Sequence, residues 1–230
     1  MTAMTTAELL PEPFLHPGEP LTPDDLLRIA YGGGRRELVD GCLVITRDVG
    51  HWTPADLLEL PEDNRKHELL DGQIVISPSP RPIHQRAVFR LAKALDLVLP
   101  PELEVLPPEL EVLTAPVDVH IPHGLPTLLL PDVIVVPTIT VDTELVSRPV
   151  LAVEVLSPST RRFDLGRKRA AYARYGIGVY LVVDPLVPAL TVLTLDGADY
   201  VETARGEGDE LVRVDGPVVL ELSAAQLVRH

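Results

Sequence analysis

The apolar residues follow helix-like and strand-like spacings, in an order typical of a mixed α/β domain. Residues 82–98 have the spacing of an amphipathic helix, and residues 161–175 predict a second helix that Gly176 would end. Residues 189–215 predict a meander of strands with turns at glycines. Three further runs are dense in Val, Leu and Ile, as strands buried on both faces are: 128–136, 150–156 and 179–183. The order predicts a sheet with one or two helices packed against it.

An ungapped internal repeat with an offset of 31 residues occupies the first third of the chain. Residues 21–27 match residues 52–58, and residues 37–45 match residues 68–76. Each copy predicts a short helix started by Thr-Pro and a β-hairpin that turns at Asp-Gly. Two copies are too few for a solenoid, so we interpret the first as a partial duplication that packs beside the second as an extra hairpin. The expected organisation is a flexible Pro-rich tail (1–20), the partial duplicate (21–50) and the main domain (51–230).

The composition is that of a folded but acidic protein. The chain has 230 residues, of which 46% are hydrophobic, and a net charge of −14, which disfavours tight non-specific binding to a phosphate backbone. Ten of the twenty basic residues nevertheless lie in segments 81–93 and 161–174. These segments could be solvated helix faces or phosphate-binding surfaces, and both interpretations stay open. The single cysteine and the lack of a membrane-spanning run or a secretory signal favour a soluble protein of the cytoplasm.

The candidate chemistry centres on two carboxylates and a lysine. Asp132 precedes one predicted strand and Glu154 lies inside another, where an unpaired carboxylate is costly. About 3.6 residues per turn predict one inward face for the helix that follows, made of Asp164, Leu165, Lys168, Tyr172 and Tyr175. Carboxylates suit Mg²⁺, and a lysine can orient a water or stabilise developing charge, which indicates metal-assisted hydrolysis of a phosphate ester. Purely structural roles stay open, with Glu154 in a salt bridge and Lys168 packed beside the tyrosines.

Short motifs follow one another along residues 51–230. They are Thr53-Pro54; Glu68-Leu69-Leu70-Asp71-Gly72; Pro78-Ser79-Pro80 with His84-Gln85; Pro131-Asp132-Val133; Val153-Glu154-Val155-Leu156-Ser157-Pro158-Ser159-Thr160; Asp164 with Lys168, Tyr172 and Gly176; and Tyr180 with Asp184-Pro185. In this order they resemble the Uma2 family of restriction-endonuclease-like proteins. The resemblance implies a PD-(D/E)xK nuclease fold, which is an α/β fold with a mixed sheet flanked by helices.

The resemblance also implies roles for single residues. Asp132 and Glu154 match the family's two metal-binding positions, and Glu68 matches a further ligand or a water-orienting base. Leu156 stands where the ordinary nuclease pattern has its lysine. Lys168, on the following helix, would supply that lysine instead and orient the attacking water.

The remaining expectations concern substrate and partners. The residues expected to touch DNA, or water and phosphate at the metal, are His84, Gln85, Arg86, Arg161, Arg162 and Tyr172. The leading interpretation is an endonuclease that uses Mg²⁺ or Mn²⁺ and engages DNA weakly or only with metal. A homodimer is expected by analogy with related nuclease folds. Two alternatives stay open: a binding or scaffold module of the same fold with little or no turnover, and a general acid/base hydrolase using Glu68 and Glu154 on a small substrate.

Overall fold

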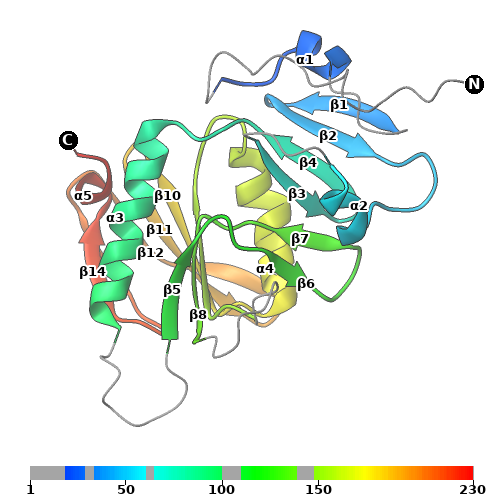
Figure 1. Ribbon diagram of the computed structural model, residues 1–230. Helices are drawn as coiled ribbons and strands as arrows, with labels where there is room; N and C mark the ends of the chain where they lie inside the picture. The colour runs from blue at the N-terminus through cyan, green and yellow to red at the C-terminus, as the bar shows by residue number, and fades with distance from the viewer. Residues whose placement is uncertain (1–18, 29–33, 61–64, 100–109, 139–147, 230) are drawn as a thin grey trace, which may run out of the picture.

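The strands of the chain form two six-stranded sheets and a two-stranded ladder within the residues that the structure describes (Figure 1). The structure is a computed structural model, and it describes residues 19–28, 34–60, 65–99, 110–138 and 148–229. The tail predicted for residues 1–20 lies outside the described residues except for its last two positions. Among the described residues, no helix combines the length and the apolar character that crossing a bilayer requires.

The central sheet has the strand order β12-β11-β10-β9-β8-β5. Strands β9 and β10 run parallel and the other neighbours run antiparallel, so the sheet is mixed, as predicted. The bounds of its strands are β5 Leu110–Thr114, β8 Val133–Pro137, β9 Leu151–Val155, β10 Val179–Asp184, β11 Ala189–Asp196 and β12 Asp199–Glu207. Strands β9 and β10 are apolar on both faces because both faces are covered.

Different helices cover the two faces of the central sheet. Helix α3 (Pro82–Val98) and the short α5 (Ala224–Val228) pack on one face, together with the ladder of β13 (Leu211–Val214) and β14 (Leu220–Ser223). The second predicted helix packs on the opposite face, between the central sheet and the N-terminal sheet (Figure 1). This arrangement confirms the predicted class of a mixed sheet flanked by helices.

The N-terminal sheet is antiparallel throughout and has the order β1-β2-β4-β3-β7-β6. Its strands are β1 Arg35–Val39, β2 Cys42–Thr46, β3 Lys66–Leu70, β4 Gln73–Ser77, β6 Val119–Ile121 and β7 Thr127–Leu129. Residues 128–136, predicted as one strand, are two: β7 belongs to this sheet and β8 to the central sheet. The break falls at Pro131, which has no N–H for a ladder, and at Asp132.

The two segments that match in sequence have matching local structures. Helices α1 (Pro23–Arg28) and α2 (Pro54–Leu58) each precede a hairpin with positive φ at Asp and Gly, as an Asp-Gly turn requires. The hydroxyl of Thr22 donates to Asp25 at 2.7 Å, as that of Thr53 donates to Asp56 at 2.6 Å. The expected contact of residues 21–50 with the rest of the fold is present, because β2 pairs with β4. Duplication as the origin of this likeness stays a prediction.

The helix predicted over residues 161–175 contains a wider turn than expected. It continues through a π-helical segment, η2 (Phe163–Lys168), into α4 (Arg169–Tyr175), and ends at Gly176 with φ of +79°. A π turn closes its hydrogen bonds over five residues, so a regular α-helical wheel misplaces its side chains. Leu165, predicted to face inward, is 41% exposed, whereas Asp164 and Lys168 are buried, as predicted.

Candidate active site

Four carboxylates from both sheets and from η2 converge at the base of one cavity. Glu68 comes from β3, Asp132 from the crossing between β7 and β8, Glu154 from β9 and Asp164 from η2, and all four are buried. The cavity has a volume of about 390 Å³, and Asp132, Glu154 and Lys168 line it. The burial of four acids in one place requires cations nearby.

Lys168 is the most deeply buried cation of this cluster. Its side chain is 2% exposed, and its Nζ lies 2.9 Å from Glu68 Oε2, 3.1 Å from Glu154 Oε1 and 3.2 Å from Asp164 Oδ1. Burial alone would lower the pKa of Lys168, but Glu154 and the other carboxylates raise it well above its ordinary value. Its ammonium donates a hydrogen bond to Glu154 Oε1 and lies within ion-pair distance of the other two carboxylates. Lys168 is thus a buried counter-ion of the three carboxylates. Its expected role in orienting an attacking water stays a prediction.

Asp132 is held as a carboxylate by donors on its Oδ2. The backbone N–H of Val155 donates to this oxygen at 2.8 Å, and His84 Nε2 lies 3.2 Å from it. Burial would raise the pKa of Asp132, but Lys66, His84 and the Val155 N–H outweigh it and hold that pKa well below its usual range. The expected contact of His84 with the metal site is thus a direct one to Asp132.

Glu154 accepts a hydrogen bond from Tyr172: the tyrosine hydroxyl donates to Glu154 Oε1 at 2.7 Å. Burial raises the pKa of Glu154 to about 8, with Asp164 and Asp132 adding to the shift and the lysines opposing it. Burial likewise raises the pKa of Asp164. Tyr172 is fully buried, so the structure corrects its expected contact with substrate: it orients Glu154 instead.

Lys66 is a site residue that the sequence reasoning missed. Its Nζ lies 3.5 Å from Asp132 Oδ1 and 3.8 Å from both Glu154 Oε2 and Glu68 Oε1. Two signals in the sequence could have found it. Lys66 stands two residues before Glu68 on a predicted strand, so both point to the same face. The chain also has only three lysines, and Lys168 is another of them.

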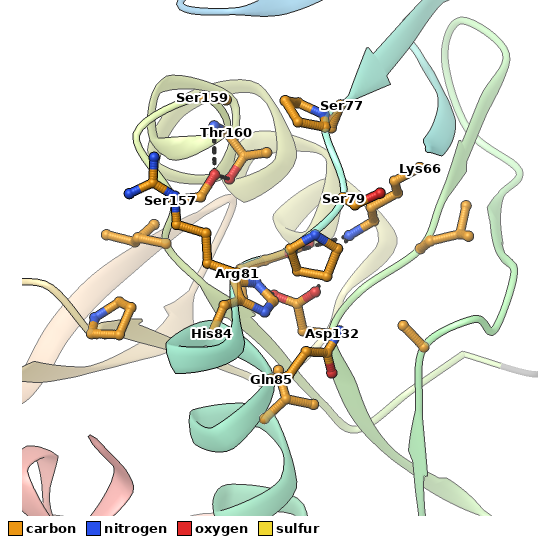
Figure 2. A pocket seen from close by; sticks show the side chains of 18 of the residues that line it. Lys66, Ser77, Ser79, Arg81, His84, Gln85, Asp132, Ser157, Ser159 and Thr160 are labelled. Carbon is orange, nitrogen blue, oxygen red and sulfur yellow. Dashed lines mark hydrogen bonds and ion pairs between the residues drawn. The ribbon is translucent and has the colours of Figure 1, made fainter. Parts of the chain in front are cut away.

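The wall of the cavity comes from several elements and mixes polar with apolar side chains (Figure 2). The labelled side chains include Lys66, Ser77, Ser79, Arg81, His84, Gln85, Asp132, Ser157, Ser159 and Thr160. His84 and Gln85, at the start of α3, reach the cavity, as expected from the resemblance. Ser157 lies at the turn that starts the second helix and accepts from the Thr160 N–H at 3.1 Å.

Most arginines of the two basic segments are paired within the protein. Arg86 donates to the carbonyl of Val228 at 3.4 Å, and Arg161 pairs with Asp184. Neither Arg86 nor the exposed Arg162 lines the cavity. Arg86 and Arg161 are thus engaged within the protein, and contact of Arg86, Arg161 or Arg162 with phosphate stays a prediction. Further along, Arg167 and Arg174 both bind Asp71, at the β3–β4 turn.

The donor set fits a hard divalent cation in part. Asp132 Oδ1 and Glu154 Oε2 face the same space at Lys66 Nζ, and carboxylate oxygens suit Mg²⁺ or Mn²⁺. Glu68 is engaged through both oxygens, by the Leu130 N–H at 2.9 Å and by Lys168. The three-carboxylate ligand set expected from the sequence is not assembled here: among the described residues no three His, Cys, Asp or Glu side chains are placed to hold one metal ion. Mg²⁺ often keeps several waters and is bound by only one or two carboxylates, so Asp132 and Glu154 alone could serve as its protein ligands.

Comparison with known proteins agrees with this fold. A crystal structure from Anabaena variabilis, described as a "putative nuclease belonging to DUF820", superposes with a TM-score of 0.62 at 19% sequence identity. The match covers 76% of this chain and 97% of that one, and at this identity it shows the fold alone. No curated protein matches the chain. The model of the Uma2 family, described as "Putative restriction endonuclease", matches residues 54–225. The resemblance seen in the sequence is thereby confirmed, and the chain belongs to the Uma2 family.

Proposed function

We propose that the protein is a metal-dependent endonuclease that hydrolyses phosphodiester bonds of DNA. The observation that carries the proposal is the convergence of Asp132, Glu154 and Glu68 on two lysines at the base of one cavity. The description of the family as a restriction endonuclease supports the same reaction class.

Asp132 and Glu154 would hold Mg²⁺ or Mn²⁺ through the oxygens that face the cavity. When bound, such an ion supplies an activated water and neutralises charge on the scissile phosphate. Lys168 and Tyr172 keep Glu154 in place from behind, and His84 does the same for Asp132. Glu68 supports the metal site indirectly. It pairs with Lys168, and it accepts a hydrogen bond from the N–H of Leu130, close to Asp132 in the chain.

DNA would approach from the open side of the cavity, where His84, Gln85, Arg81 and the serines lie (Figure 2). The buried cluster has four carboxylates against two ammonium groups, and it repels phosphate until a divalent cation is bound. Most arginines near the site already have intramolecular partners. We therefore propose weak or metal-dependent binding of DNA. Homodimer formation and a cytoplasmic location remain parts of this proposal.

The test is cleavage of supercoiled plasmid and of single-stranded DNA in Mn²⁺, with wild type beside Asp132→Asn. Asp199→Asn is the matched control, since Asp199 is an exposed aspartate whose side chain pairs with Arg169 and accepts from the Tyr200 N–H. Cleavage lost in Asp132→Asn alone would support the proposal. Equal cleavage by all three proteins would point to a contaminant. No cleavage by any of them, with Mn²⁺ binding retained, would point to another substrate or to a missing partner. No cleavage and no Mn²⁺ binding would favour the scaffold module.

A further inference from the structure

The two oxygens of each carboxylate that lines the cavity, Asp132 and Glu154, have different partners. On Asp132, Oδ2 accepts from Val155 and faces His84, which leaves Oδ1. On Glu154, Oε1 accepts from Lys168 and Tyr172, which leaves Oε2. Within the described residues, the ionic contact of each remaining oxygen is to Lys66 Nζ, at 3.5 and 3.8 Å. One ammonium therefore sits where both cavity-facing oxygens point.

Lys66 is held more loosely than Lys168. The three contacts of Lys66 are 3.5–3.8 Å long, beyond ordinary hydrogen-bond distances, whereas those of Lys168 are 2.9–3.2 Å. The Lys66 side chain is 20% exposed and lines the cavity, against 2% for Lys168. Lys66 is also the first residue of β3, so its long stem starts at the edge of the site. Charge attraction alone holds this ammonium, and a path to solvent lies beside it.

We propose that Lys66 is a built-in counter-ion that competes with the divalent metal for Asp132 Oδ1 and Glu154 Oε2, and that it leaves this position when metal binds. The inference rests on the proposed metal-dependent function and goes beyond it, because it assigns a role to a residue outside the predicted ligand set. With the ammonium in place, the buried carboxylates keep part of their charge compensated. With metal bound, an ammonium at the same oxygens would lie within a few ångströms of the divalent cation, which would repel it.

The position of Lys66 also makes it a positioning residue for the free protein. It bridges β3 of the N-terminal sheet to Asp132, at the crossing between the sheets, and to Glu154 of the central sheet. Without the Lys66 ammonium, the carboxylates of the metal-free protein lose part of their charge compensation. The metal also no longer competes with an ammonium for the oxygens of Asp132 and Glu154. These two effects change metal affinity in the same direction, because each favours the bound form relative to the free one.

The first test measures the Mn²⁺ dissociation constant at pH 8 for wild type, Lys66→Met and Lys93→Met. Titration is followed by the electron paramagnetic resonance signal of free Mn²⁺, a readout that needs no DNA and no turnover. Lys93 is the exposed lysine of α3 and serves as control. We expect Lys66→Met to bind Mn²⁺ at least about tenfold more tightly, since a cation beside the ligand oxygens is gone, and Lys93→Met to match wild type.

The second test uses the wild-type protein, so it does not depend on the folding of a variant. Only three lysines are present, and mass spectrometry can follow each one during a short pulse of an acetylating N-hydroxysuccinimide ester. We expect saturating Mg²⁺ to increase the acetylation rate of Lys66 by about threefold or more, because the side chain moves into solvent. The rates at the exposed Lys93 and the buried Lys168 should stay unchanged.

The outcomes separate this inference from the proposed function. Equal or weaker Mn²⁺ binding by Lys66→Met, or metal binding without a change in Lys66 reactivity, would overturn the counter-ion role and leave the metal site intact. No Mn²⁺ binding by any of the three proteins would overturn the metal-dependent function and this inference together.

Discussion

Replacement of Tyr172 by phenylalanine removes a single hydroxyl from the buried cluster and leaves the packing of the ring unchanged. The hydroxyl donates to Glu154 Oε1 at 2.7 Å, and the side chain is 0% exposed. A hydrogen bond to a charged group contributes about 1.5–3 kcal/mol, so we expect Tyr172→Phe to lower the free energy of unfolding by about 2 kcal/mol at pH 9, above the pKa of Glu154 of about 8. For a chain of this length the melting temperature should fall by about 4–8 °C.

The neighbouring Tyr200 supplies the control for that measurement. It belongs to the same stack of rings, but its hydroxyl donates to a neutral carbonyl, that of Ile177, at 2.7 Å. Tyr200→Phe should therefore cost about 1 kcal/mol. Both variants are unfolded by urea and by heat in EDTA, with circular dichroism as the signal. A loss in Tyr172→Phe no larger than in Tyr200→Phe would refute the reasoning, because the hydroxyl would then not support Glu154 in solution.

Three further measurements test other parts of the structure. Burial raises the pKa of Cys42 to about 11, so this thiol should not react with Ellman's reagent at pH 8 until the protein is unfolded, when one equivalent should react. Asp71→Asn keeps the turn but removes the charge that Arg167 and Arg174 share, and the unfolding free energy should fall by about 1 kcal/mol in urea titrations. Partial burial would raise the pKa of Asp184, but hydrogen bonds from an arginine and two backbone N–H groups lower it below 3.8. Its stabilising effect is thus present at neutral pH and is lost as the pH falls below 3.8, so the urea midpoints of wild type and Asp184→Asn should differ at pH 7 and approach each other as the medium is acidified below that pH.

The elements that the sequence predicted correctly are those set by local chemistry. Helix α3 covers residues 82–98, as predicted, because its apolar period is regular and a proline stands at its first position. The hairpins turn at Asp40-Gly41 and Asp71-Gly72, where positive φ is observed at all four residues. Asp132 and Glu154 were identifiable because a carboxylate beside or inside an apolar strand requires a partner.

The elements that the sequence did not predict depend on contacts between distant residues. The run 128–136 looks like one strand by composition, and only the pairing of its halves with different sheets divides it. Arg167 lies 96 residues from Asp71 along the chain, so no local pattern could show that its charge is used internally. Lys66 is near Glu68 in sequence, but its contacts with Asp132 and Glu154 exist only after the two sheets meet.

The division of work between arginine and lysine explains how an acidic chain assembles this site. Seventeen of the twenty basic residues are arginines, and two of the three lysines lie among the carboxylates. Arg167 uses its planar fork to bind the carbonyl of Leu70 and the side chain of Gln73, which ties the second helix to the β3–β4 hairpin. A compact ammonium such as that of Lys168 can instead lie within ion-pair distance of three carboxylates at once. The arginines thus hold the N-terminal sheet against the helix from one side, and the lysines hold Glu68 against Asp132 and Glu154 from the other. The geometry of the site therefore depends on the docking of the two sheets as much as on the carboxylates themselves.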